Sequence, residues 1–268
     1  MGRRHVVTAQ RRTAASILTL LIALVVTSCS SSAKQRPTSA PSPPRALSTV
    51  RLANPPGPIC RVEVIGRSVL GRPLTAYSCG RAQSTRRVLV VGVVHGNEAD
   101  GLPIAQALVR APSVAGALLV VIPDLNPDGR ALGTRQNARH VDLNRNFPYH
   151  WQRTGQPGDQ QWTGPSVLSE PESRALVGVV RRVRPTVTVW FHQPVGVVDD
   201  SGGSADVERR FARVLGEPFQ RLPRYDGSAV SWQDTAYRGT TAFVVELPRR
   251  VTAELRRRAL LAVRDLER

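Results

Sequence analysis

The chain has 268 residues, of which 41% are hydrophobic and 21% are charged. This composition supports one substantial folded core and excludes a disordered or fibrous protein. The formal net charge is +17, and every basic residue except Lys34 is an arginine. Because the arginines are scattered singly and in pairs, the charge does not indicate a nucleic-acid-binding protein, although arginine suits carboxylate-bearing partners in general.

The first 28 residues have the pattern of a signal peptide. Four arginines precede a mostly apolar run over 14–26, and no acidic residue occurs before Cys29. The run of 13 residues is shorter than the roughly 20 that a membrane-spanning helix needs. The segment from Val26 to Cys29 resembles the lipobox of bacterial lipoproteins, in which the cysteine is acylated. We therefore expect an exported protein, lipid-anchored through Cys29 on the extracytoplasmic face of the bacterial cell membrane, or secreted if Cys29 is not acylated.

Residues 29–59 are rich in serine and proline, which is typical of a linker, so we expect the folded domain to span residues 60–268. Strand-like runs over 61–66 and 74–78 flank a turn that contains glycine and proline. A hairpin of these runs brings Cys60 and Cys79 together. Because exported proteins fold in an oxidising compartment, we favour a Cys60–Cys79 disulfide over two free thiols.

Beyond the hairpin, β-branched strands alternate with amphipathic helices. The expected buried strands cover 87–94, 117–122, 186–191 and 241–245. The expected helices cover 103–109, 171–183 with Ser169 as a cap, 205–215, and a last stretch that begins after Thr252. Residues 155–158 and 199–203 are predicted as flexible loops. This order predicts a single three-layer α/β domain, with a mixed, mostly parallel β-sheet flanked by helices.

Polar residues stand at the ends of three of the predicted strands. His95 follows the first of these strands, with Glu98 three residues later, and His192 and Glu246 follow two others. The carboxyl ends of the strands in an open α/β sheet gather at one edge, where sites are built. Two histidines and a carboxylate with one open position are how catalytic zinc is held. The pattern therefore predicts a zinc site at His95, Glu98 and His192.

Glu246 is the candidate general base of this site. Zinc brings the pKa of a bound water toward neutrality and so makes a nucleophile, but a base must take the proton. Glu246 ends an otherwise apolar strand, where partial desolvation would raise its pKa into a useful range. The alternative interpretation is a buried structural glutamate.

Several ordered motifs make the region from Ile65 to Pro248 resemble the zinc carboxypeptidase family, or funnelins, and within it the small murein peptide amidase-like branch. The motifs are Ile65-Gly66-Arg67-Ser68 with Gly71-Arg72-Pro73, His95-Gly96-Asn97-Glu98, Asn126-Pro127-Asp128-Gly129, Asp142-Leu143-Asn144-Arg145-Asn146-Phe147-Pro148, His192 and Glu246. The resemblance implies the zinc carboxypeptidase-like fold and one Zn²⁺ per chain, held by His95, Glu98 and His192, with Glu246 as general base.

The same resemblance implies two further roles. Asn144 and Arg145 would hold the terminal carboxylate of the substrate, for which a planar guanidinium is well suited. An upstream arginine would stabilise the oxyanion. We choose Arg135 for that role, with Arg130 and Arg139 as alternatives.

The sequence departs from the family pattern at one position. Many digestive-type members carry a mobile tyrosine shortly after a tryptophan, between the last histidine and the glutamate. Here Trp232 is followed two residues later by Asp234, and Tyr237 is out of register.

Four further residues near the motifs have secondary interpretations. His140 and His150 are interpreted as loop residues rather than ligands. Asp128 or Asp142 is expected to orient a ligand histidine through its other ring nitrogen.

These features favour an exported, monomeric zinc metallopeptidase that hydrolyses an amide bond next to a free carboxylate, with peptidoglycan stem peptides as the expected substrate and no nucleic-acid partner. One alternative is a succinylglutamate desuccinylase or aspartoacylase-like deacylase of N-acyl amino acids, which shares two of the motifs. Another is a non-catalytic lipoprotein that binds cell-wall peptides. The side-chain preference stays open, with Arg238 as a candidate contact for an acidic group.

Overall fold

The computed structural model describes residues 60–112 and 116–268. The predicted signal peptide (1–28), Cys29 and the linker (29–59) lie outside the described residues. Within the described ranges, no helix is both long enough and apolar enough to cross a membrane.

The domain begins with the predicted hairpin. Strands β1 (Arg61–Arg67) and β2 (Pro73–Gly80) pair antiparallel, with Arg61 opposite Ser78. This register brings the residues that flank the hairpin together, and Cys60 and Cys79 form a disulfide across it. The predicted disulfide is confirmed.

Four parallel strands form the middle of the sheet. They are β3 (Arg87–Val91), β4 (Leu118–Ile122), β5 (Val187–His192) and β8 (Thr241–Glu246). Each is largely buried and rich in β-branched residues, which is typical of strands covered on both faces. All four were predicted to within a few residues.

The described residues form an eight-stranded sheet in the order β1-β2-β4-β3-β5-β8-β6-β7. Strand β6 (Val197–Asp199) runs antiparallel to β8, and the short β7 (Phe219–Gln220) runs parallel to β6. The prediction of a flexible loop from residue 199 was therefore wrong for Asp199, which ends a buried strand.

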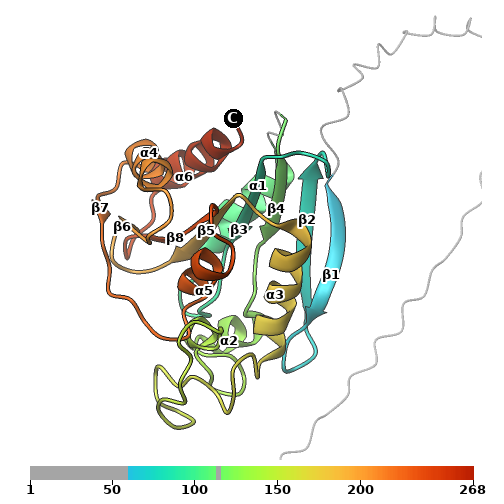
Figure 1. The fold of residues 1–268 in the computed structure, drawn as a ribbon, viewed down its shortest axis with the longest axis vertical. Helices are drawn as coiled ribbons and strands as arrows, with labels where there is room; N and C mark the ends of the chain where they lie inside the picture. Colours follow the sequence, from blue (N-terminus) through green and yellow to red (C-terminus); the bar gives the residue numbers. More distant parts are fainter. Residues whose placement is uncertain (1–59, 113–115) are drawn as a thin grey trace, which may run out of the picture. The chain divides into compact units, whose positions relative to one another are not determined.

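Helices cover both faces of the sheet (Figure 1). Helices α1 (Gly101–Arg110), α4 (Ala205–Leu215) and α6 (Ala253–Leu266) pack in one core with Val88 and Val90 of β3. Helices α3 (Pro171–Val183) and α5 (Ala229–Ala236) pack in the other core with Leu89 and Val91. Side chains of β3 thus alternate between the two cores, as the period of a strand requires. The three-layer α/β architecture is confirmed.

Two details of the helices differ from the prediction. The residue before α3 that acts as its N-cap is Glu170, not Ser169, and its side chain makes no capping hydrogen bond. The helices α2 (Pro127–Leu132) and α5 and the 3-10 helix η1 (Leu143–Arg145) were not predicted, and neither were the short strands β6 and β7. Elements α2 and η1 carry or support residues of the site described below.

Candidate metal and peptide site

The site forms at the carboxyl edge of the parallel strands. His192 and Glu246 end β5 and β8, while His95 and Glu98 lie in the tight turn that follows β3. The amide of Glu98 donates to the carbonyl of His95 at 3.0 Å, which closes the turn. A glycine is required at position 96, because a Cβ there would lie 2.0 Å from the backbone of Gly129 in α2. The four residues therefore lie together at the carboxyl edge of the sheet, as predicted.

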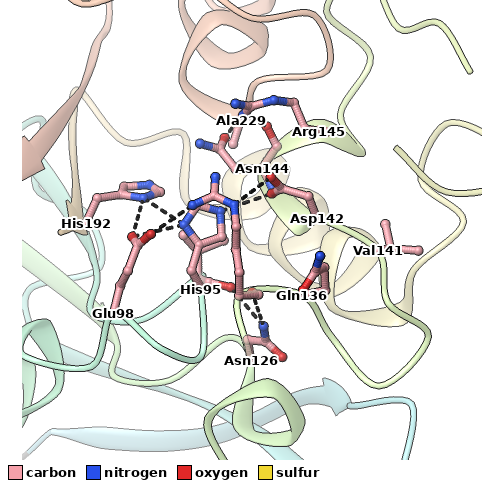
Figure 2. Close-up of polar contacts among 12 residues, drawn as sticks. His95, Glu98, Asn126, Gln136, Val141, Asp142, Asn144, Arg145, His192 and Ala229 are labelled. Atoms are coloured by element: carbon pink, nitrogen blue, oxygen red, sulfur yellow. Dashed lines mark hydrogen bonds and ion pairs between the residues drawn. The ribbon is translucent and has the colours of Figure 1, made fainter. Parts of the chain in front are cut away.

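His95, Glu98 and His192 point toward one another (Figure 2). The Nδ1 atoms of the two histidines are 3.1 Å apart, and they lie 3.0 Å (His95) and 3.1 Å (His192) from Oε2 of Glu98. Tetrahedral zinc with bonds of 2.0–2.1 Å would hold neighbouring ligand atoms about 3.3 Å apart. These three atoms therefore form a triangle that fits three corners of a zinc coordination sphere. The group is the metal-ligand cluster found among the described residues.

The charge states of Glu98 and His192 suit the binding of a divalent cation. Burial alone would raise the pKa of the Glu98 carboxyl, but hydrogen bonds from His192 and His95 hold it well below its usual range. Burial lowers the pKa of His192, which favours the neutral ring that ligates metals. A carboxylate and a neutral imidazole are the forms in which these groups bind zinc.

Asp142 is the buried residue that connects the triad to the rest of the site. Its Oδ1 lies 3.0 Å from Nε2 of His95, and its Oδ2 accepts a hydrogen bond from Nε of Arg135 at 3.0 Å. Burial acts to raise the pKa of Asp142, but the interaction with His95 and the charge of Arg135 lower it well below its usual range. Asp142 thus takes the expected position beside the second ring nitrogen of a triad histidine. Asp128 does not, since it bonds to Ser68 and Arg72 near the β1–β2 turn.

Arg135 connects Asp142 to Glu98 of the triad through its guanidinium. Its Nη1 donates to Oε1 of Glu98 at 2.8 Å. Asn126, the N-cap of α2, fixes the backbone nearby, because its amide donates to the carbonyls of Val94 and Arg135. The alternative arginines are elsewhere. Arg130 pairs with Asp124, and Arg139 is an exposed side chain near Glu170.

Asn144 and Arg145 reach the site through η1. Asp142 is the N-cap of this short helix, and its Oδ1 accepts the amide of Asn144 at 2.9 Å. Oδ1 of Asn144 in turn accepts the amide of Ala229 at the start of α5, at 3.0 Å. This bond leaves the Asn144 amide nitrogen as the donor available to a ligand. Arg145 is buried, and its Nε has no hydrogen-bond partner within the described part of the chain.

Glu246 completes the site from β8. Its Oε2 is buried and has no hydrogen-bond partner among the described residues. Burial raises the pKa of Glu246 to about 7, and the negative charge of Glu98 acts in the same direction. A cation at the triad would act in the opposite direction. Glu246 therefore has an oxygen that can accept a proton near neutral pH.

One cavity of about 310 Å³ joins all these groups. Its lining includes His95, Glu98, His192, Glu246, Arg135, Asn144 and Arg145. His140, His150 and Arg238 do not line this cavity, and Arg238 lines two other hollows elsewhere on the domain. The structure thus gathers the seven residues predicted for zinc, base, oxyanion and carboxylate roles, and leaves His140, His150 and Arg238 outside the cavity.

Sequence reasoning missed Tyr225. Its ring centroid lies 4.1 Å from the guanidinium carbon of Arg145, and it lines the same cavity. Tyr237 instead packs against Trp232, away from the site. Tyr225 also stands between His192 and Glu246 in the chain, so the search for a tyrosine in that interval, not only close to Trp232, would have found it.

Comparison with known proteins decides the family. Residues 49–197 match the family model for zinc carboxypeptidases, which is more than half of the chain. The chain belongs to the zinc carboxypeptidase family. It is accordingly a hydrolase that acts on peptide or amide bonds, and the family is zinc-dependent.

Relatives within the family are similar over most of the domain. Murein peptide amidase A of Escherichia coli K12 is 32% identical over 195 residues, which cover 68% of this chain and 78% of that protein. Murein peptide amidase A of Vibrio campbellii is 34% identical over 201 residues, covering 68% and 77%. Within the family, the chain is therefore similar to the murein peptide amidase branch.

Solved structures of zinc carboxypeptidases and of a murein-tripeptide amidase have the same fold as this chain. The crystal structure of murein-tripeptide amidase MpaA from Escherichia coli O157 has a TM-score of 0.64 and 28% identity, and covers 83% of this chain and 96% of that one. Carboxypeptidase A from Helicoverpa armigera has a TM-score of 0.67 at 17% identity, covering 78% and 68%, and so shares the fold.

Proposed function

We propose that this protein is an exported zinc amidase that hydrolyses the amide bond next to a free carboxylate in peptidoglycan stem peptides. The observation that carries the proposal is the single cavity in which a metal triad, a carboxylate base and a carboxylate-binding pair meet. The similarity to murein peptide amidases supports the substrate class. The same relatives favour a peptidase over a deacylase of N-acyl amino acids.

In this proposal His95, Glu98 and His192 hold one zinc ion per chain. When bound, zinc polarises the carbonyl of the scissile amide and acidifies water. Glu246 takes the proton of the attacking water at Oε2, the buried oxygen without a partner, and returns it to the leaving amine. Arg135 stabilises the negative charge that develops on the carbonyl oxygen, since its guanidinium lines the cavity beside Glu98.

Asn144 and Arg145 bind the free carboxylate of the substrate. The backbone of η1 fixes both residues, and the stack of Arg145 on Tyr225 orients the guanidinium. A carboxylate held here lies in the same cavity as the triad, so the amide next to that carboxylate is the one presented for hydrolysis.

The test offers the zinc-loaded protein two substrates. One is a stem tripeptide ending in γ-D-glutamyl-diaminopimelate, and the other is N-succinylglutamate. We expect release of diaminopimelate by mass spectrometry, no release of succinate, and loss of the activity with a zinc chelator. Release of succinate alone would transfer the assignment to a deacylase, and no turnover of either compound would contradict the proposal.

Export with acylation of Cys29 is also a proposal. The arginine-rich, apolar N-terminal segment supports it, and so does the disulfide, because disulfides persist in oxidising compartments. Labelling of cells with radioactive palmitate tests it. We expect label on the wild-type protein and none on Cys29→Ala, whereas label on both would contradict acylation at this position.

A further inference from the structure

The catalytic cavity contains a second charged pair that the proposed mechanism does not use. Asp199 and Arg224 both line it, together with Glu246 and Val244. Asp199 ends β6, and Arg224 lies in the segment between β7 and α5. Neither residue contacts the triad or the Asn144–Arg145 pair in the hydrogen bonds and ion pairs of the described residues.

The pair lies on the inner wall of the cavity, away from the sheet edge. In the antiparallel β6–β8 ladder, Val197 is opposite Glu246 and Val198 is opposite Val245. Asp199 therefore lies two residues further along β6 than the partner of Glu246, or about 7 Å deeper along the strands. In the proposed function Arg145 binds the carboxylate of the substrate's terminal residue, and the amide of that residue faces the triad. The side chain of the same substrate residue is then the group that can fill the deeper space.

Asp199 is already saturated with hydrogen bonds. Its Oδ1 accepts from the amide of Leu222 at 2.8 Å and from Nη1 of Arg224 at 3.2 Å. Its Oδ2 accepts from Oγ of Ser201 at 2.9 Å and from the same Nη1 at 2.8 Å. The Asp199 side chain is only 5% exposed. Asp199 is thus an anchor that holds Arg224, not a free carboxylate that would attract a cation.

Arg224 retains unused donors. Of the five N–H groups of a guanidinium, those on Nη1 serve Asp199 and the carbonyl of Leu222, and one on Nη2 serves the carbonyl of Asp200. Nε–H and the second Nη2–H have no acceptor among the described residues. The Arg224 side chain is 26% exposed and lines the cavity. An anchored guanidinium with unused donors beside a substrate space is a carboxylate-binding group.

We propose that Arg224, held in place by Asp199, binds a carboxylate at the far end of the side chain of the substrate's terminal residue. This inference rests on the proposed function, because it takes the terminal residue to lie between Arg145 and the triad. It narrows the substrate class to terminal residues with a second, distal carboxylate, of which diaminopimelate is one. A terminal lysine has the same chain and distal amine as diaminopimelate but lacks that carboxylate.

The test compares binding of two peptides, γ-D-glutamyl-diaminopimelate and γ-D-glutamyl-lysine, by calorimetry. Glu246→Gln is the background, so that the peptide is not consumed. We expect the diaminopimelate peptide to bind roughly ten- to hundredfold more tightly than the lysine peptide, which is the range for hydrogen bonds to charged groups. Adding Arg224→Gln should reduce this ratio to near one. Adding Arg238→Gln, which removes an exposed arginine outside the cavity, should leave it unchanged.

A ratio that survives Arg224→Gln, or is absent from the background protein, would overturn the inference. If Arg224→Gln does not fold, Arg224→Lys takes its place, because lysine keeps the charge but changes the donor geometry. We then expect the binding ratio to fall several-fold, and an unchanged ratio would overturn the inference. Turnover by the wild-type protein separates the two proposals. Hydrolysis of both peptides at equal kcat/KM would refute only the role of Arg224 and would leave the proposed function standing. An Arg224-dependent binding ratio without any hydrolysis would refute only the proposed function.

Discussion

His192 and Glu246 are paired in register at the carboxyl ends of the neighbouring parallel strands β5 and β8. Strands in a sheet lie about 4.8 Å apart, and paired residues direct their side chains to the same face. The backbone of two buried strands therefore brings one histidine of the triad and the proposed base to the same cavity. The separation of these two groups is therefore set by the pairing of two strands rather than by a loop.

Glu246→Gln should abolish most of the hydrolysis without loss of metal. Glutamine fills the same volume but cannot take a proton, and loss of a general base costs roughly 10²–10⁴ in rate. The measurement is kcat on a stem tripeptide together with zinc content by mass spectrometry. Glu254→Gln, on the exposed face of α6, is the control with full activity. Equal activity of the two variants would remove Glu246 from the mechanism.

Asp142→Asn should weaken zinc binding by roughly 10- to 100-fold, because Asp142 orients His95 through the ring nitrogen that does not face the triad. The variant should also raise KM, since Asp142 caps η1 and so positions Asn144. Competition with a zinc chelator measures the affinity. Asp206→Asn, whose carboxylate is 98% exposed, should change neither quantity. An Asp142→Asn protein with wild-type zinc affinity but lower thermal stability would reduce Asp142 to a structural role.

The sequence predicted those parts of the site that depend on strand ends. The runs that became β3, β5 and β8 are mainly apolar and rich in β-branched residues, and His95, His192 and Glu246 follow directly after their last apolar residues. Because the carboxyl ends of parallel strands lie at one edge of the sheet, the sheet topology brings these three residues together.

Arg135, Asn144 and Arg145 do not end strands, and they were predicted from the motifs shared with the zinc carboxypeptidase family. Other parts of the site depend on contacts that no local pattern encodes. The choice between Asp128 and Asp142 is one of them, because Asp142 reaches His95 across 47 residues. Strand β6, which carries Asp199, is also three residues long, too short to show a periodic pattern. Tyr225 lies in an irregular segment, and its place beside Arg145 is set by how that segment folds back over η1.

Removal of the disulfide should destabilise the domain without changing the site. Cys60 and Cys79 are 19 residues apart, and a loop of this length accounts for about 3 kcal/mol of unfolding free energy. We expect Cys79→Ser to lower the denaturant midpoint while kcat at 25 °C is retained. The wild-type protein in a reducing agent should unfold at the midpoint of the variant. Identical midpoints for oxidised and reduced wild type would contradict a stabilising disulfide.

Gly227→Ala should disturb carboxylate binding. Gly227 has a φ of +75°, and a Cβ at this position would lie 2.0 Å from the carbonyl oxygen of Arg145. Movement of that carbonyl displaces η1, so KM should rise and stability should fall by more than about 1 kcal/mol. Gly133→Ala is a matched control, since Gly133 has a φ of +66° but open space around it. It should lose stability from backbone strain but keep its KM. A KM change of equal size in both variants would show that strain, not the clash with Arg145, is responsible.

Glu208 on α4 should make the stability of the domain fall as pH rises. Burial, followed by the charges of Asp200 and Asp234, raises the pKa of Glu208 to about 8 in the folded state. In an unfolded chain the carboxyl has the ordinary glutamate pKa of 4.5 and releases its proton there. Between these two values the folded state holds more protons than the unfolded state, so the contribution of the neutral carboxyl is fully present below about 4.5 and is lost as pH rises through about 8.

Glu208→Gln keeps the neutral shape of the side chain at every pH and therefore removes this dependence. We expect the Tm of Glu208→Gln relative to wild type to be higher at pH 9 than at pH 5, measured by calorimetry at fixed ionic strength. Asp234, whose pKa is raised to about 7 mainly by burial, keeps its own dependence in the variant and gives a residual slope of the same sign. A Tm difference that is the same at both pH values would mean that Glu208 is ionised in the folded protein across this range, and that neighbouring groups compensate for its burial.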